Sequence, residues 1–235
     1  MLNSSAKAEE TTTHTSDNAI DRDELKFERW CRSLKYITGL GLTEQERELY
    51  NQKRAKELEA SQCKKCKKWR DELIRSSPAV IFMLQNIEKA GCKISKKHFA
   101  CHPCDTTRSG GFSPEFGILL CQNRFLSKKH QEITMVHEMV HLYDHCRFKI
   151  DWTNCLHHAC SEVRAASLSG DCGWTREIRR GFFTFTKQHQ TCVKRRAILS
   201  VSQNSHCSAP GIAERTVAEV FESCFRDTQP FDEIY

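Results

Sequence analysis

His137-Glu138-Met139-Val140-His141 is the most informative stretch of this 235-residue chain, because its residue types and spacing specify a metal site on a helix. At 3.6 residues per turn, positions i and i+4 lie close together on one helix face, so two imidazoles can share one zinc ion. The intervening carboxylate lies beside them, where it can act as a base toward water. The pattern predicts His137 and His141 as metal ligands, Glu138 as the catalytic residue and Zn²⁺ as the cofactor.

The residues around this motif separate by chemistry around the same helix. With roughly 100° per residue, His141 falls roughly 40° from His137 and Glu138 roughly 100° from it. Asp144 and His145 fall within or beside that arc. The opposite side holds only apolar or aromatic side chains: Met135, Val136, Met139, Val140, Leu142 and Tyr143. We therefore expect one buried apolar face and one face that gathers every metal-capable side chain.

A third ligand must come from outside the motif, because a zinc site needs at least three. His145 is eight positions after His137, about one turn too far along an unbroken helix to share the ion. Asp144 suits a supporting role beside His141. Glu162 lies in a second helical segment, 21 residues after His141. It is the predicted third ligand, and an ordinary surface glutamate is the alternative.

The pattern on either side of the motif predicts an α+β domain. Upstream, Pro78 begins a helix that runs to Ala90, and residues 92–126 have the short apolar runs and turn residues of strands. Gly117–Gln122 is the clearest strand; it is either a sheet edge that binds extended peptide or a plain core strand. Downstream, the pattern predicts helices at about residues 127–148, 155–168, 188–202 and 210–226.

The N-terminal quarter differs in composition from the rest of the chain. Residues 1–24 are rich in Thr, Ser, Asp and Glu and are expected to be a disordered tail, without the features of a secretory signal or an Arg-rich transit peptide. Asp23–Tyr36 and Thr43–Ala60 are predicted to be charged helices without a strong apolar stripe, the second opened by a capping box of Thr43 and Glu46. We expect residues 1–62 to be an appendage and residues 63–235 to form the metallopeptidase domain.

Charge and hydrophobicity limit the kinds of partner that the protein can bind. No uninterrupted apolar run approaches the ~20 residues of a membrane-spanning helix. Residues 1–62 hold 10 Lys and Arg against 12 Asp and Glu, whereas the remainder holds 26 against 18, a net charge of +8. Basic clusters of this kind can meet nucleic acid or anionic lipid, although most are simply solvated faces.

Fourteen cysteines are many for this length. In an oxidising compartment most would form disulfides, whereas a reducing one would require metal or catalytic roles. Cys63/Cys66 and Cys101/Cys104 form two CxxC pairs, which are compatible with a zinc ribbon, a redox dithiol or structural disulfides. The sequence favours structural disulfides but does not determine their connectivity.

Longer stretches of the chain resemble one known family. Residues 137–147 (HEMVHLYDHCR), 159–172 (ACSEVRAASLSGDC) and 188–195 (QHQTCVKR) are similar to the mitochondrial inner membrane metalloproteases that act as ATP synthase assembly factors. Shorter matches occur at residues 109–112, 120–123 and 220–225. The resemblance covers roughly residues 66–231.

The resemblance implies a zincin-like fold, with a small sheet and an active-site helix, and a peripheral position on the intermembrane-space side of the inner membrane. It implies a zinc endopeptidase that processes the precursor of the Fo channel subunit of ATP synthase and helps that subunit join the proteolipid ring. His137 and His141 match the family's metal ligands, and Glu138 matches its catalytic acid. The family-like cysteines are Cys66, Cys92, Cys101, Cys104, Cys121, Cys146, Cys160, Cys172, Cys192 and Cys224; Cys31, Cys63, Cys155 and Cys207 are extras.

Two other functions compete with this interpretation. The basic domain and the HExxH motif are compatible with a DNA-associated metallopeptidase, but the many cysteines argue against a reducing nucleus, and we expect no nucleic-acid partner. An assembly chaperone with an intact zinc site but no need for peptidase activity is the alternative from another class.

Overall fold

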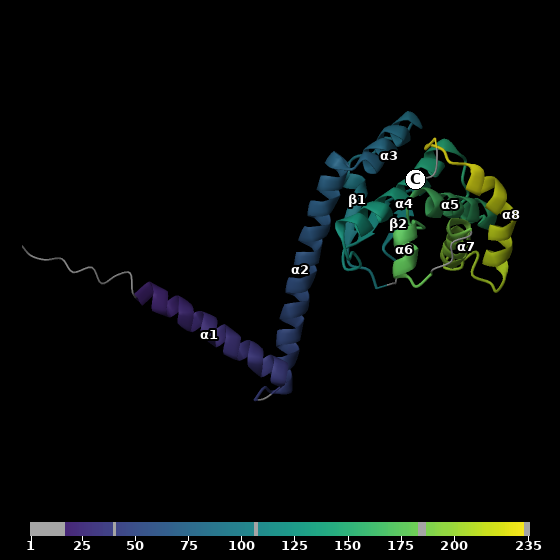
Figure 1. The fold of residues 1–235 in the computed structure, drawn as a ribbon. Helices are drawn as coiled ribbons and strands as arrows, with labels where there is room; N and C mark the ends of the chain where they lie inside the picture. The colour runs from purple at the N-terminus through teal and green to yellow at the C-terminus, as the bar shows by residue number, and fades with distance from the viewer. Residues whose placement is uncertain (1–16, 40, 106–107, 183–186, 233–235) are drawn as a thin grey trace, which may run out of the picture. The chain divides into compact units, whose positions relative to one another are not determined.

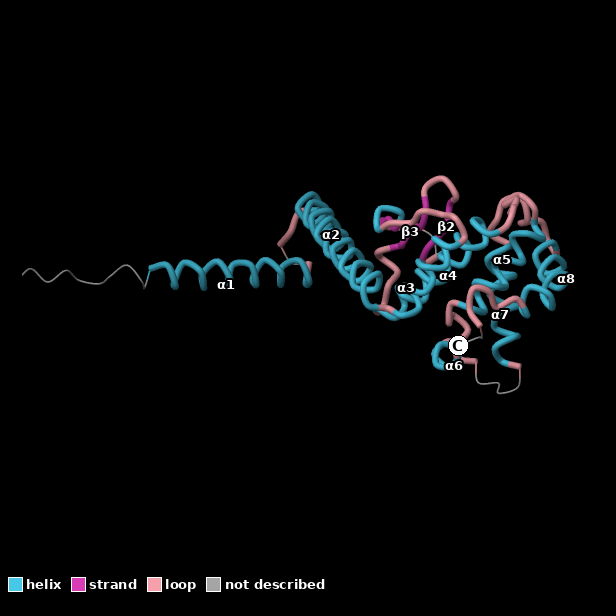
Figure 2. Tube along the Cα trace, turned by 90° about the horizontal axis from the view of Figure 1, so that it is seen from above, coloured by secondary structure: helices cyan, strands magenta, loops and turns pink. Residues whose placement is uncertain are grey.

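The computed structural model describes residues 17–39, 41–105, 108–182 and 187–232, with the side chains of the first helix described from Arg22 onward. Helices dominate, and three strands form one small sheet, as expected of an α+β protein (Figures 1 and 2). The helices are α1 (Asp17–Thr38), α2 (Glu44–Ser76), α3 (Pro78–Lys89), α4 (Lys128–Arg147), α5 (Cys155–Leu168), α6 (Trp174–Arg179), α7 (Gln188–Val201) and α8 (Ile212–Arg226), with a short 3₁₀ helix η1 (Lys96–His98). The strands are β1 (Phe99–His102), β2 (Gly110–Ser113) and β3 (Gly117–Cys121).

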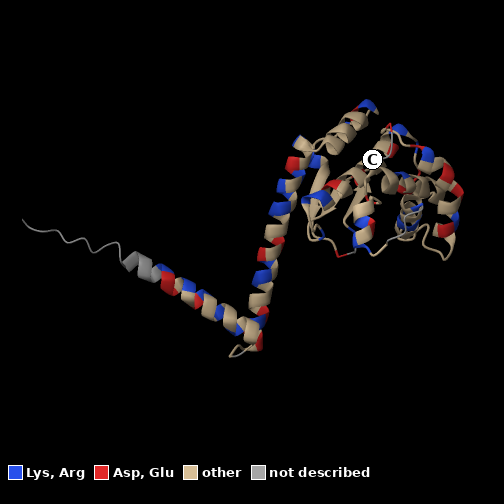
Figure 3. Cartoon of the chain, in the orientation of Figure 1, with Lys and Arg blue, Asp and Glu red and all other residues tan. Residues whose placement is uncertain are grey.

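The chain forms two compact units, Met1–Glu57 and Leu58–Tyr235, and the division falls inside α2. The predicted helix at residues 43–60 is therefore too short, because α2 continues to Ser76. Its charged residues of both signs alternate along most of its length, as they do on α1 (Figure 3). The expected domain boundary between residues 62 and 63 stays a prediction.

The N-terminal unit corrects two expectations. The predicted disordered tail, residues 1–24, is partly wrong because α1 begins at Asp17; residues 1–16 lie outside the described part of the chain. The helix also has an apolar row, since Phe27, Trp30, Leu34 and Ile37 recur every three or four positions and are all exposed. The capping box of α2 is confirmed: the Thr43 amide donates to the Glu46 carboxylate at 2.9 Å, and the Glu46 amide donates to the Thr43 hydroxyl at 3.3 Å.

The sheet has the order β1-β3-β2. Strand β3 pairs with β1 in parallel and with β2 antiparallel, with Gly110 opposite Leu120 and Ser113 opposite Gly117. The predicted strand at residues 117–122 thus exists but is the central one, so the suggestion that it is a peptide-binding edge is wrong. It pairs with both neighbours, and Ile118 and Leu120 are buried whereas Leu119 is exposed. The edge strand beside the active-site helix is β2.

Helix α4, which carries the HExxH motif, lies at the centre of the larger unit. It packs against β2, β3, α3 and α5. Ser127 caps its first turn by accepting a hydrogen bond from the His130 amide at 3.1 Å. The predicted apolar face is confirmed, with Met135, Met139 and Val140 fully buried. Most of the opposite face is buried as well, because α5 packs against α4, and His137 stays partly exposed at 17%.

Two hydrophobic cores flank this helix pair. The first contains residues of the C-terminal part of α2, of α3, of the sheet and of α4, and the second lies among α5, α7 and α8. Helices α4 and α5 are neighbours, so the second core holds α5 against the motif helix. This packing brings Glu162 of α5 to His137 and His141 of α4.

Six disulfides join the described elements of the larger unit: Cys66–Cys101, Cys92–Cys146, Cys104–Cys121, Cys155–Cys207, Cys160–Cys224 and Cys172–Cys192. The ten family-like cysteines pair only with one another, and two of the four extras form their own bridge. Disulfides of this number are typical of an oxidising compartment. They fix α2 to β1 and α5 to α8, so they hold both layers around the site.

The disulfide pattern contradicts the zinc ribbon and the redox dithiol. Cys66 and Cys104 each bond to a cysteine outside their own CxxC pair, and Cys63 is a free thiol, as is Cys31. Neither CxxC pair is therefore available to a metal ion or to dithiol exchange. The CxxC pattern suggested the wrong partners because it shows only the local spacing of the cysteines. The cysteines that bond to one another are brought together only when β1 packs beside α2 and β3 in the folded chain.

Candidate metal centre

Three side chains from two helices converge at one point. On α4, His137 Nε2 lies 3.5 Å from Glu162 Oε2, and His141 Nε2 lies 3.5 Å from Glu162 Oε1. One ligand atom from each of the three residues lies within 4.8 Å of the others. These separations are long for hydrogen bonds but close to the ~3.3–3.4 Å between two ligands of a tetrahedral zinc with bonds of about 2.0–2.1 Å. The predicted set of His137, His141 and Glu162 thus has the geometry and the donor types for a metal ion.

A buried relay holds the ring of His141. Its Nδ1 lies 2.8 Å from the Ser161 hydroxyl, which in turn donates to Asp144 Oδ2 at 2.9 Å. Because that hydroxyl proton is directed to the carboxylate, its oxygen accepts from Nδ1–H, and Nε2 keeps its lone pair toward Glu162. Arg164 pairs with Asp144 at 3.0 Å, and both of these side chains are only 2% exposed. The expected supporting role of Asp144 is thus seen to act through Ser161.

The carboxylate of Glu162 is also held by its neighbours. Ser200 of α7 donates to Oε1 at 2.6 Å, and His158 Nε2 lies 3.2 Å from the same oxygen. On its other side, His158 Nδ1 lies 3.1 Å from the Asn204 side-chain nitrogen, which can only donate. His158 Nε2 therefore carries its proton and donates to Glu162. Two donors on one oxygen fix the orientation of the carboxylate.

Glu138 lies at the same site but outside the three-residue set. Its side chain is buried against β2, where a Cβ at Gly110 would come within 3.1 Å of Glu138 Oε1 and 2.7 Å of Thr134. Glycine at this strand position therefore makes room for the carboxylate. Burial raises the pKa of Glu138 to about 7, and the Glu162 charge adds to it while the His137 charge opposes it. A carboxyl group with this pKa can accept and return a proton near neutral pH.

The two histidines differ in their electrostatics. Burial lowers the pKa of His141 to about 3, so its ring is neutral, as a metal ligand must be. Burial also acts to lower the pKa of His137, but donation of its ring N–H to the Glu162 carboxylate and the charge of Glu138 outweigh burial and raise that pKa to about 9.

A cavity of about 540 Å³ opens onto these groups. The edge strand β2 forms one wall with Gly110–Ser113, and Trp152 and His158 form another. Among the described strands β2 pairs with β3 alone, and the other side of such an edge strand can bind an extended peptide as an added strand. An extended chain added to this edge would lie in the cavity that His137, Glu138 and His141 also line.

The structure also shows what the sequence analysis missed. Among the described residues, His145 is not part of the group whose ligand atoms lie within 4.8 Å of one another, as its spacing predicted. Ser161 and Ser200 were not identified, because serines carry no spacing signal. His158 could have been found, since it precedes Glu162 by one helical turn, and Gly110 could have been suspected from the Gly110-Gly111 pair.

Comparison with known proteins agrees with this site. Residues 64–232 match the model of the Peptidase M76 family. The chain is 44% identical to the mitochondrial inner membrane protease atp23 of Aspergillus clavatus, over all of both proteins. It is 48% identical to the protein of that name from Kluyveromyces lactis, covering 89% of this chain and 90% of the relative. It is 47% identical to the protein of that name from Saccharomyces cerevisiae (strain Lalvin EC1118), covering 91% of this chain and 97% of the relative.

No solved structure matches the chain. The family match covers well over half of the chain and includes every residue of the three-ligand set and Glu138. Within the described residues, no helix is long and apolar enough to cross a membrane. The chain belongs to the Peptidase M76 family and is a peptidase of the mitochondrial inner membrane.

Proposed function

We propose that the protein is a zinc-dependent endopeptidase with a zincin-like arrangement of site residues. His137, His141 and Glu162 would hold the ion, and Glu138 would act as general base and acid. The observation that carries this proposal is the convergence of the three ligand groups around 3.5 Å separations, with Glu138 buried beside them at the cavity. Two nitrogens and one carboxylate oxygen with an open fourth position are typical of catalytic zinc.

The residues of the chain divide the work of peptide hydrolysis. When bound, zinc would polarise the scissile carbonyl and lower the pKa of water. Strand β2 would align the peptide along its free edge, in line with the cavity. Glu138 would take the proton from the attacking water and pass it to the leaving amine, for which a pKa of about 7 is well placed. The contacts of Ser161, His158 and Ser200 would keep the ligand atoms in position throughout.

The proposed substrate is the precursor of the Fo channel subunit of ATP synthase, and the protein would also act as a chaperone when that subunit joins the proteolipid ring. The similarity to the assembly-factor family supports this, as do the disulfides expected of an intermembrane-space protein. Peripheral attachment to the inner membrane on this side is supported by the exposed apolar row of α1, which has Lys26, Arg29 and Lys35 beside it.

Glu138→Gln separates the enzyme from a chaperone without peptidase activity. The amide keeps the volume of the side chain but cannot accept the proton, and loss of a general base costs roughly 10²–10⁴-fold in rate. Cells that carry the variant should accumulate the unprocessed precursor yet still assemble ATP synthase. Glu219→Gln, at an exposed position of α8, is the matched control. Loss of assembly by a folded, zinc-loaded Glu138→Gln protein would show that cleavage is the essential step.

A further inference from the structure

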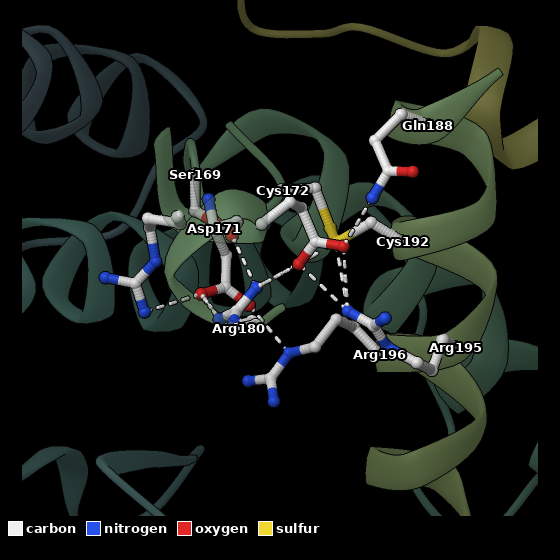
Figure 4. Close-up of a disulfide and its surroundings, with 10 residues drawn as sticks. Ser169, Asp171, Cys172, Arg180, Gln188, Cys192, Arg195 and Arg196 are labelled. Carbon is white, nitrogen blue, oxygen red and sulfur yellow. Dashed lines mark hydrogen bonds and ion pairs between the residues drawn. A yellow bond between two sulfur atoms is a disulfide. The ribbon is translucent and has the colours of Figure 1, made fainter. Parts of the chain in front are cut away.

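Arginines line one wall of the cavity that holds the proposed metal site. Arg176 lies on α6, Arg180 directly follows that helix, Arg196 lies on α7, and Arg108 precedes β2. Arg180 and Arg196 converge on the buried carboxylate of Asp171 (Figure 4). The neighbouring disulfide Cys172–Cys192 joins the two segments that carry them, so this wall has a fixed position relative to α5.

The charges on this wall do not cancel. Asp171 pairs with Arg176 at 3.0 Å, Arg180 at 2.8 Å and Arg196 at 2.7 Å. The second carboxylate, Glu177, is fully buried and pairs with Arg180 and with Arg195. Glu177 and Arg195 do not line the cavity, but with them the described cluster around Asp171 has four guanidinium groups and two carboxylates, an excess of two positive charges.

Arg176 is the member of this group with a hydrogen-bond donor that has no partner among the described residues. It makes one ion pair, with Asp171, and within the described residues its Nε is buried without a hydrogen-bond partner. A guanidinium presents five donors in a planar fork that suits a carboxylate. Nε itself is buried, so a carboxylate in the cavity would meet the exposed part of the guanidinium; the side chain lines the cavity and is 22% exposed.

The charges of these arginines affect the pKa of His130, which lies in the N-terminal part of α4. Burial lowers the pKa of His130, and the charges of Arg176 and Arg180 lower it further. Arg176, Arg180 and Arg196 line the same cavity as β2, His137 and Glu138. A peptide added to β2 would therefore share this cavity with the arginine wall and the proposed reaction centre.

We propose that Arg176, supported by Arg180 and Arg196, forms a subsite for an Asp or Glu side chain of the peptide substrate to one side of the scissile bond. This inference rests on the proposed peptidase function of the same cavity. The occupant is an acidic side chain because the arginines and the reaction centre share one cavity, and the substrate of a peptidase is a polypeptide. The subsite would make cleavage depend on an acidic residue to one side of the bond.

The test measures the ratio of kcat/KM for two peptides that differ only by Glu or Gln. The zinc-loaded full-length protein first cleaves a mixed peptide library, and mass spectrometry of the products shows which position favours acids. One cleaved peptide is then synthesised in two versions, with Glu or with Gln at that position. Wild-type protein should prefer Glu by roughly five- to ten-fold, as a partly buried charged hydrogen bond provides.

Variants of α6 assign that preference to Arg176. Arg176→Gln should bring the ratio near one, Arg176→Lys should keep part of it, and Arg176→Glu should favour Lys over Glu in the peptide. Arg179→Gln removes the same charge from an exposed position of the same helix and should change nothing. Equal rates for the two peptides with wild-type protein, or a full preference in Arg176→Gln, would overturn the proposal.

Binding distinguishes failure of the subsite from failure of the proposed enzyme. If wild-type protein cleaves no peptide above the background of Glu138→Gln, the peptidase proposal fails. A binding experiment therefore uses zinc-loaded Glu138→Gln protein and two labelled alanine-rich peptides, one with a single Glu and one with a single Gln. Fluorescence anisotropy measures the Kd of each peptide. Tighter binding of the Glu peptide, lost with a second change of Arg176→Gln, supports the subsite. Equal Kd values would refute it whether or not cleavage is seen.

Discussion

Replacing Ser161 by alanine removes the hydroxyl that joins His141 to Asp144. Two hydrogen bonds are lost, one of 2.8 Å to His141 Nδ1 and one of 2.9 Å to Asp144 Oδ2. Asp144 keeps Arg164 at 3.0 Å, so the group left without a partner is Nδ1–H of His141. That ring is buried, with a side-chain exposure of 6%, and water has little access to it.

The cost should appear mainly in metal binding. A buried donor without a partner costs about 1–3 kcal/mol. Without metal, His141 can move its proton to Nε2 and donate to Glu162, which avoids this cost. With metal, Nε2 is occupied and the proton must stay on Nδ1. We therefore expect zinc affinity to fall about 10- to 100-fold, the usual effect of removing a group that holds a metal-ligating histidine.

Competition with a chromophoric chelator measures the zinc affinity of the purified variant. Ser167→Ala is the matched control: Ser167 lies on the same helix, is equally buried, and has no side-chain hydrogen bond within the described residues. Its affinity should match the wild type. Thermal unfolding with excess chelator should show that both variants are folded. Equal zinc affinities of Ser161→Ala and Ser167→Ala would refute the relay.

Three further predictions concern the ligands, the thiols and the buried acid. Glu162→Ala should lose bound zinc and activity, whereas His145→Ala should retain both; metal analysis of the two proteins decides between them. Alkylation of denatured, unreduced protein should modify two cysteines, Cys31 and Cys63, and a Cys31→Ser/Cys63→Ser protein should give none. Burial acts to raise the pKa of Asp171, but its arginine partners hold it well below the usual value. Its stabilising effect is then present above pH ~4, the unfolded pKa, and is lost as the pH falls further. Asp171→Asn should cost on the order of 2 kcal/mol in urea unfolding at pH 7 and much less at pH 3; an equal cost at both would contradict the ion-pair explanation.

The sequence by itself determined the helix of the reaction centre and its chemistry. The spacing of His137 and His141 predicts their shared face because helix geometry is local, and the apolar residues between them predict the buried face. The predicted helices after the motif are present with end positions close to those expected, since caps and periodicity are also local signals. Short α6 was missed because six residues give too little periodic pattern.

The tertiary structure alone decided how distant segments meet. Glu162 could be suggested as a ligand from the sequence, but its distance from His137 depends on the packing of α5 on α4. The order of the strands likewise depends on long-range pairing, which is why β2 rather than β3 lies at the edge. Cysteine spacing suggested CxxC units, but a disulfide forms between sulfurs that the fold brings together. The arginine wall has the same origin, because the burial of Asp171 and Glu177 attracts guanidinium groups from separate helices to one side of the cavity.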